Sequence, residues 1–464
     1  MREETDLAVP PRGPEHDADP TETPGFVEAV LGAIETRDVD ALKAIVSDLH
    51  ETDVAHLLEA LPAADRPQLI ELLGSDFDFT ALTELDETVR VQILEELPTQ
   101  TVVEGVRDLD SDDAVYILED LDDADKQEIL ASLPIPERAA LQRSLDYPEE
   151  SAGRRMQTEF IALPPFWTVG QALDYIGETE GLPEVFFEVF VVDPSYRLSG
   201  SVPLDRLLRT KRGVKLGDVV MPDRHVVRAT DDQEDVARIF ERYNLISAPV
   251  VDEGERLVGV LTIDDIVDVI QEEADEDLKA LGGVAGDEEL SDSFWYIAKS
   301  RFSWLLFNLI AANLACFVIA MFEGELQRMV ALAVLMPIVA SQGGNAATQT
   351  MTVAVRALAT RELRPSNARR VIARELLVGL FNGVVFAVIM AAVVFARFGI
   401  ADLGFVIALA MIINLLAAAL GGIMIPLILD RLKVDPAVSS GPFVTTITDV
   451  VGFFAFLSIA SLWF

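Results

Sequence analysis

The chain of 464 residues has very little cysteine, histidine or lysine. Its one cysteine, Cys316, excludes a disulfide within the chain and suits a reducing compartment. All four histidines precede the apolar C-terminal part, and no Ser-His-Asp set is visible there, so we do not expect an enzyme. The N-terminus lacks the short apolar stretch of a signal peptide, and we expect no cleaved leader.

Positive charge is also scarce, since the net charge is −41. From Lys299 onward there are 8 acidic and 12 basic residues, which leaves 69 acidic and 24 basic residues before it. So acidic a surface argues against nucleic-acid partners. The carboxylates could bind divalent cations, or they could adapt the surface to a very salty cytoplasm. Because the acid excess is spread over every soluble segment, we favour a halophilic protein in which only a few carboxylates are specific ligands.

Long apolar runs are confined to the C-terminal part, where five stretches are each long enough to cross a membrane. The loop between the second and third stretches is rich in arginine, whereas the opposite loops are not. We therefore expect an integral protein of the plasma membrane, surrounded by lipid, with cytoplasmic N-terminal domains. The odd number of spans puts the C-terminus outside. The stretches are residues 302–322, 328–355, 373–396, 403–429 and 441–464.

The soluble part contains two internal repeats. Residues 1–25 are rich in proline and acids and predict a disordered tail. In residues 26–150 the segment 50–62 recurs at 86–98, each copy with a polar start, a helical apolar face and a Leu-Pro end, which predicts a stack of short helices. In residues 151–270 a second repeat has an offset of 59 residues and predicts two paired β-α-β modules.

Asp449 is the one carboxylate inside the fifth apolar stretch, where a charge is costly and usually functional. On a helix it shares a stripe with Gly441, Thr445 and Gly452, which indicates a cavity or a helix neighbour. An interhelical hydrogen bond or a buried ion pair is the alternative. The second stretch holds M-P-I-V-A-S-Q-G-G-N-A-A-T-Q-T at 336–350, whose polar face could line a cavity or join helices.

Two membrane motifs, G-G-N-A-x-x-Q and G-P-F-V-T-T-x-x-D-V-x-G-F, resemble those of the MgtE family of magnesium channels. The order of domains and the join Y-P-E-E-S-A-G-R-R-M are similar too, over nearly the whole chain after residue 25. The resemblance implies a multidomain fold: an α-helical repeat N domain (26–150), paired α/β CBS modules (151–270), a connecting helix (271–298) and an all-α transmembrane domain of five helices (299–464).

The family further implies a homodimer with one central pore. Asp449 would meet its twin there and hold a hydrated Mg²⁺, while Thr445 and Asn345 would add neutral oxygens. Mg²⁺ keeps its waters and is held by few carboxylates, which agrees with this arrangement. Thr348 stands where the family has an amide.

Regulatory Mg²⁺ sites are implied by the same resemblance, although Asn244 and Tyr116 stand where further acids are usual. In the second module, Gly259, Thr262 and Asp265 match an element that holds a ribose, so ATP or another adenine nucleotide could bind; a structural strand–helix turn is the alternative. The candidate regulatory ligands are Asp112, Asp232, Glu234, Asp265, Glu276, Asp277 and Asp435.

These observations lead us to expect a Mg²⁺-selective channel that mediates magnesium uptake and is gated by cytosolic Mg²⁺. The alternative is an ion-coupled exchanger of Mg²⁺, Mn²⁺ or Co²⁺ with the same fold, because intramembrane carboxylates serve both. A pure sensor anchored by its spans is disfavoured by the polar stripe around Asp449.

Overall fold

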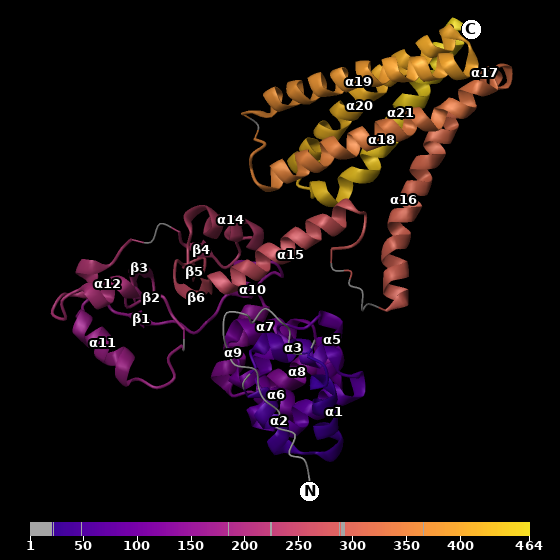
Figure 1. Ribbon diagram of the computed structural model, residues 1–464. Coiled ribbons are helices and arrows are strands. Elements are labelled where there is room, and N and C mark those ends of the chain that lie inside the picture. Colours follow the sequence, from indigo (N-terminus) through magenta and orange to yellow (C-terminus); the bar gives the residue numbers. More distant parts are fainter. Residues whose placement is uncertain are drawn as a thin grey trace. The chain divides into compact units, whose positions relative to one another are not determined.

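The computed structural model describes residue 21 and residues 23–47, 49–183, 185–222, 225–286, 288, 293–364 and 366–464. Most of the acidic tail expected at 1–25 therefore lies outside the described residues. The chain divides into two compact units, residues 1–271 and 272–464 (Figure 1).

Short helices build the N domain, as the repeat predicts. The two best copies begin at polar caps, where His50 Nδ1 accepts from the Thr52 amide and Asp86 Oδ1 accepts from the Thr88 amide at 3.2 Å. Both copies end at an extended leucine that precedes proline. The helices are α1 (Phe26–Thr36), α2 (Val39–Val46), α3 (Glu51–Ala60), α4 (Arg66–Leu73), α5 (Glu87–Glu96), α6 (Thr99–Asp108), α7 (Ser111–Glu119), α8 (Asp123–Ser132) and α9 (Ile135–Leu145), with short 3₁₀ turns at Ala63–Asp65, Gly74–Asp76 and Phe79–Leu82.

Two three-stranded sheets follow, one in each copy of the 59-residue repeat. Each sheet joins a parallel pair to an antiparallel pair, and the antiparallel registers Glu188↔Pro203 and Ser247↔Thr262 are 59 residues apart. We name these two copies the module pair. The elements are α10 (Ala152–Arg155), β1 (Ala162–Leu163), α11 (Val169–Glu178), β2 (Glu188–Val192), β3 (Leu198–Pro203), α12 (Leu204–Arg209), α13 (Leu216–Val219), β4 (Val227–Arg228), α14 (Gln233–Tyr243), β5 (Ser247–Val251), β6 (Leu257–Thr262) and the start of α15 (Ile263–Leu281).

The two modules are related by a pseudo-twofold axis. The Leu198 amide donates to the Glu255 carbonyl at 3.3 Å, and the Leu257 amide donates to the Tyr196 carbonyl at 3.0 Å. The two donors are 59 residues apart in the sequence, and so are the two acceptors. The sequence offset is thus a symmetry of the folded pair.

The acidic helix α15 ends at Leu281, immediately before Gly282 and Gly283. Gly283 has φ of +74°, a backbone conformation that glycine adopts readily. The next helix, α16, begins at Phe294, ahead of the apolar stretch, because the Ser293 hydroxyl caps it by accepting from the Tyr296 amide at 3.3 Å.

Five helices in the described part of the chain are long and apolar enough to cross a membrane, as the apolar stretches predict. Helix α20 contacts α18, α19 and α21 (Figure 1) and carries more buried residues than any other of these helices, whereas α16 contacts α21 and buries only Ala315 and Val318. The helices are α16 (Phe294–Ala320), α18 (Val330–Ala359), α19 (Ala368–Phe398), α20 (Ala401–Arg431) and α21 (Pro436–Trp463), with the short α17 (Glu323–Arg328) between the first two.

Candidate pore and regulatory sites

Asp449 lies half-buried on α21. Among the residues that the structure describes, none forms a hydrogen bond or an ion pair with its carboxylate. One turn earlier, the Thr445 hydroxyl donates to the carbonyls of Gly441 and Pro442, each at 3.2 Å, and its oxygen keeps its capacity to accept. Neither an interhelical hydrogen bond nor a buried ion pair therefore accounts for Asp449 within the described part of one chain.

Helix α18 carries a polar face that the single chain leaves exposed. Asn345 is exposed on it, and so are Ser341, Gln349 and Thr352. The helix stays continuous through Pro337 and the Gly343-Gly344 pair. Lipid gives polar side chains no partner, so this face needs water or another protein surface.

The N domain and the module pair meet at the N-terminus of α7. The Ser111 hydroxyl is buried there, and it donates to the Glu159 carboxylate at 2.7 Å while accepting from the Thr158 amide at 2.7 Å. These bonds fix the segment before β1 against the helical domain.

Carboxylates from both domains gather beside this contact. Burial raises the pKa of Asp112 well above its usual range, and the negative charges of Asp265 and Asp113 raise it further. Burial likewise raises the pKa of Asp113 to about 7, helped by the charges of Asp110 and Glu84. Burial raises the pKa of Asp265 to about 7, although the Thr262 hydroxyl, which donates to its Oδ2 at 2.6 Å, opposes this. We name this group the junction cluster: Glu84, Asp110, Asp112, Asp113, Asp264, Asp265 and Asp268.

The structure thus brings Asp112 and Asp265, two of the candidate regulatory ligands, to one junction. Their neighbours Glu84, Asp113 and Asp264 were not among the expected residues. The adjacent carboxylates in D-S-D-D and I-D-D are a signal for Asp113 and Asp264, but no pattern points to Glu84.

Other expected ligands have structural partners. Asp232 caps α14 by accepting from the Glu234 and Asp235 amides at 3.0 and 3.3 Å, and Glu234 pairs with Arg238. Asp435 caps α21 by accepting from the Ala437 amide at 2.7 Å. Glu276 and Asp277 lie half-buried near the end of α15. Within the described residues, no three histidine, cysteine or acidic side chains are grouped closely enough to hold a metal.

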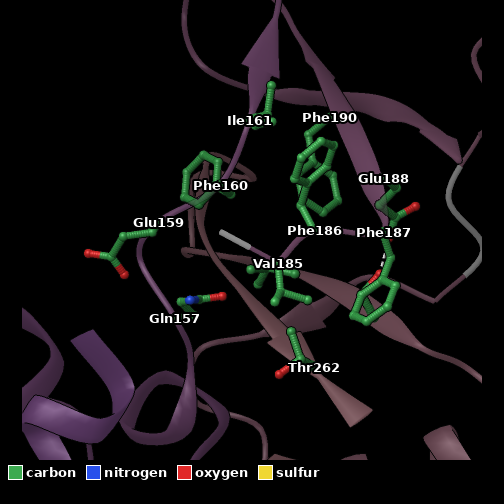
Figure 2. A pocket seen from close by; sticks show the side chains of 12 residues that line it. Gln157, Glu159, Phe160, Ile161, Val185, Phe186, Phe187, Glu188, Phe190 and Thr262 are labelled. Atoms are coloured by element: carbon green, nitrogen blue, oxygen red, sulfur yellow. Dashed lines mark hydrogen bonds between the residues drawn. The ribbon is translucent and has the colours of Figure 1, made fainter. Parts of the chain in front are cut away.

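A small pocket of about 20 Å³ lies between the two modules (Figure 2). Four phenylalanines surround it, and Glu188 on its edge accepts from the Ser247 hydroxyl at 2.8 Å. Of the three expected nucleotide residues only Thr262 lines it. Gly259 instead lets the chain approach closely, since a Cβ there would lie 2.8 Å from the Gln157 carbonyl oxygen. The phenylalanines are Phe160, Phe186, Phe187 and Phe190.

Comparison with known proteins finds family matches in the N domain, in the module pair and in the transmembrane part. Residues 336–459 match a family described as a divalent cation transporter, MgtE, residues 49–150 match the MgtE intracellular N domain, and residues 216–272 match a CBS domain. A magnesium transporter MgtE of Bacillus subtilis is 35% identical over 68% of this chain and 70% of its own length. One of Thermus thermophilus is 34% identical with the same coverage. The chain belongs to the MgtE family.

Solved structures agree with this assignment. The cytosolic domain of the Mg²⁺ channel MgtE in complex with ATP matches with a TM-score of 0.50 and 28% identity, covering 52% of this chain and 99% of that one. As an MgtE-family member this protein is a membrane transporter, and the paired modules are CBS modules, as expected. The MgtE transporter match encloses Asn345, Thr445 and Asp449, whereas Glu276 and Asp277 lie outside all three family matches.

Proposed function

We propose that this protein is a Mg²⁺-selective channel that takes up magnesium and that cytosolic Mg²⁺ closes it. The observation that carries the proposal is the Asp449 carboxylate, which no described residue pairs inside a membrane-length helix. Support comes from relatives at 34–35% identity that are named magnesium transporters. Among divalent cations, Mg²⁺ is small, gives up its waters reluctantly and suits a site with few carboxylates.

The proposed pore needs two copies of the chain. One Asp449 and the exposed face of α18 supply half of a site, and a twofold axis beside them would supply the other half. Two facing carboxylates repel each other unless a dication lies between them, so an ion is favoured at that point. Thr445 and Asn345 would then accept hydrogen bonds from the waters of the ion. The exposed polar side chains of α18 support this homodimer, because pairing would remove them from lipid.

The proposed gate uses the junction cluster and the ends of α15 and α21. Carboxylates whose pKa values are raised by burial and by each other gain most from a bound dication. Mg²⁺ bound by Asp112 and Asp265 would hold the N domain on the CBS pair. Asp232, Glu234, Glu276, Asp277 and Asp435 are the further proposed ligands, and the soluble domains are proposed to be cytoplasmic.

The proposed cytoplasm is highly saline, since 69 of the 77 acidic residues precede Lys299. Near molar salt the Debye length is only about 3 Å, which screens general repulsion between the acidic domains. Gating by Mg²⁺ would then depend on direct coordination and not on diffuse neutralisation.

The test is Mg²⁺ flux into proteoliposomes that hold the full chain or its Asp449→Asn variant. We expect the variant to remain a folded dimer and to lose selective Mg²⁺ flux. Asp402→Asn, which removes an exposed carboxylate from the first turn of α20, is the matched control and should keep the flux. Unchanged flux and selectivity in Asp449→Asn would refute the proposed pore.

The same vesicles separate a channel from a coupled exchanger. A channel carries Mg²⁺ down an imposed potential with no second ion present, whereas an exchanger stops when its counter-ion is removed. Flux that requires a gradient of Na⁺ or H⁺ would favour the exchanger.

A second proposed activity is binding of ATP or another adenine nucleotide to the CBS pair. The phenylalanines around the pocket support it, because aromatic faces stack on a base. The pocket would have to open to admit a nucleotide. The related cytosolic domain was solved with ATP. Calorimetry on the full chain should lose ATP binding in Asp265→Ala and keep it in Asp264→Ala, a change at the exposed neighbour. Equal ATP binding by the two variants would indicate that the strand–helix turn at Thr262 has only a structural role.

A further inference from the structure

Asn414 is a buried amide at the centre of the transmembrane unit. It lies on α20, the helix that contacts α18, α19 and α21, and its side chain is 1% exposed. Its Nδ2 donates to the Val339 carbonyl of α18 at 2.8 Å. Its Oδ1 is buried, and no described residue donates to it.

Two glycines make room for this amide, one on each pore helix. A Cβ built on Gly343 of α18 would lie 2.8 Å from the Asn414 Cγ, and one built on Gly452 of α21 would lie 2.8 Å from its Nδ2. Real Cβ atoms do not come so close, so any larger residue at either position would displace the amide. We name the space beside Gly343 and Gly452 the notch. It lets the Asn414 side chain pack against α18 and α21 at once.

The same two glycines neighbour the proposed pore residues. Gly343 precedes Asn345 by two residues, so on a helix the glycine faces inward to Asn414 while Asn345 faces outward. Gly452 follows Asp449 by three residues and lies on the adjoining side of α21. Any slip of α18 or α21 along Asn414 would therefore change the depth at which Asn345 and Asp449 meet an ion.

Stability alone does not explain an asparagine here. A buried amide that leaves its oxygen unpaired is worse than an apolar residue of the same shape. A buried polar residue that costs stability can instead specify helix register, as a single asparagine does in coiled coils. We propose that Asn414 is a positioning residue that sets the register of α18 against α21 and thereby the ion selectivity of the pore. The selectivity part rests on the proposed channel function, whereas the register part does not.

The central test replaces Asn414 with leucine, which has a similar shape and no polar atoms. We expect Asn414→Leu to fold with a melting temperature at or above that of the wild type. Its Mg²⁺ affinity in the pore should fall about ten- to a hundredfold, the usual effect of losing a residue that orients metal ligands. Its flux of K⁺ relative to Mg²⁺ should rise. A residue that only packs would give lower stability with unchanged selectivity.

Register is measured separately, so that the test does not depend on transport. Spin labels are attached to cysteines at Val353 of α18 and Leu462 of α21, both exposed, in a Cys316→Ser background. Labelled chains are diluted with unlabelled ones, so that the distance reports on one chain. We expect the label–label distance to shift or broaden in Asn414→Leu. If the wild type shows no Asp449-dependent Mg²⁺ flux, the channel is refuted while these distances still decide the register.

If Asn414→Leu does not fold, variants that change the side-chain volume at the glycines and at Asn414 still test the proposal. Gly343→Ala and Gly452→Ala should each change the distance and lower selectivity, and Asn414→Ala combined with Gly343→Ala should restore both in part. Gly421→Ala is the matched control on α20, because its Cβ would meet only Ile447 Cγ2 at 3.8 Å. Wild-type distance and selectivity in Asn414→Leu, or glycine variants no worse than Gly421→Ala, would overturn the proposal.

Discussion

Ser111 and Glu159 join the N domain to the CBS pair through two partly buried hydrogen bonds, in which the Ser111 amide donates to the carboxylate at 3.3 Å and the Ser111 Oγ donates to it at 2.7 Å. The same oxygen accepts from the amide of Thr158, at 2.7 Å, and from its hydroxyl, at 2.9 Å. One hydroxyl therefore holds three polar groups of the segment that enters the CBS pair.

Ser111→Ala should loosen this junction. The change leaves the half-buried Thr158 amide without its acceptor, which should cost about 1 kcal/mol, the lower end of the range for a buried group. Hydrogen–deuterium exchange of the full chain should therefore show faster exchange across residues 152–162. Ser132→Ala is the control, because the Ser132 hydroxyl is exposed and bonds only within α8. Equal protection in both variants would mean that the hydrogen bond carries no part of the docking.

The junction cluster makes the soluble domains sensitive to pH. The folded-state pKa values of Asp113 and Asp265 are raised to about 7, so between about pH 4 and 7 the folded state binds more protons than the unfolded state. Stability should consequently rise as pH falls from 8 to 5.5 without Mg²⁺, and it should depend less on pH with Mg²⁺ present.

Thermal unfolding of the detergent-solubilised protein measures this dependence. Asp113→Asn should raise the melting temperature at pH 8 and flatten the pH profile, since it removes one of the repelling charges. Asp123→Asn, a change on the exposed surface of α8, should leave the slope unchanged. A melting temperature that rises toward pH 8 would contradict the predicted direction.

Asp435 caps α21 and is also a proposed Mg²⁺ ligand, and a conservative substitution separates the two roles. Asparagine caps a helix about as well as aspartate, whereas alanine costs about 1 kcal/mol at such a position. Asp435→Asn should therefore preserve the melting temperature while raising the Mg²⁺ concentration that protects residues 266–286 from protease. Asp435→Ala should show both effects. The titration is done in about 3 M KCl, where diffuse electrostatics are screened. Protection that follows ionic strength alone would refute coordination by Asp435.

Arg90 stabilises the N domain from inside. Its side chain is 2% exposed, its Nε donates to Asp120 at 2.7 Å, and an Nη donates to the Leu85 carbonyl at 2.9 Å. Arg90→Met should lower the free energy of unfolding of the N domain by about 3 kcal/mol, the lower end of the range for a broken buried pair, because it leaves the largely buried Asp120 carboxylate unpaired. Denaturant unfolding compares it with Arg107→Met, whose arginine is exposed. A loss no larger than that of the control would exclude this role.

The repeats and spans were predictable because their signals are local. A cap, an apolar periodicity and a Leu-Pro end recur within a few residues, and the 59-residue offset repeats both strands and turns. Arg90 shows the limit of such reasoning. In the repeat it takes the place of the buried Val54, so the pattern alone predicts either a core residue or an exposed arginine. Its burial depends on Asp120, which comes from another helix.

The residues of the candidate sites also divide into those that a local sequence signal predicts and those that it does not. Asp449 stands out because its own helix is apolar, and Asp112 and Asp265 follow from the family resemblance. The roles of Glu84 and Asn414 depend on the packing of helices far apart in the sequence. Gly343, Asn414 and Gly452 form one notch, although about 70 residues separate the first two, and no short motif encodes that contact.

Helix α15 has the geometry of a lever. Its 19 residues span about 28 Å at 1.5 Å per residue, and no proline or glycine between Ile263 and Leu281 would let it bend. Asp264, Asp265 and Asp268 lie within its first two turns, close to the strand that anchors it. If the helix pivots at its first residue, a sideways shift of about 1 Å one turn along it becomes a shift of roughly 5 Å at Leu281. The length of α15 alone would therefore amplify any small movement of the carboxylates at its start.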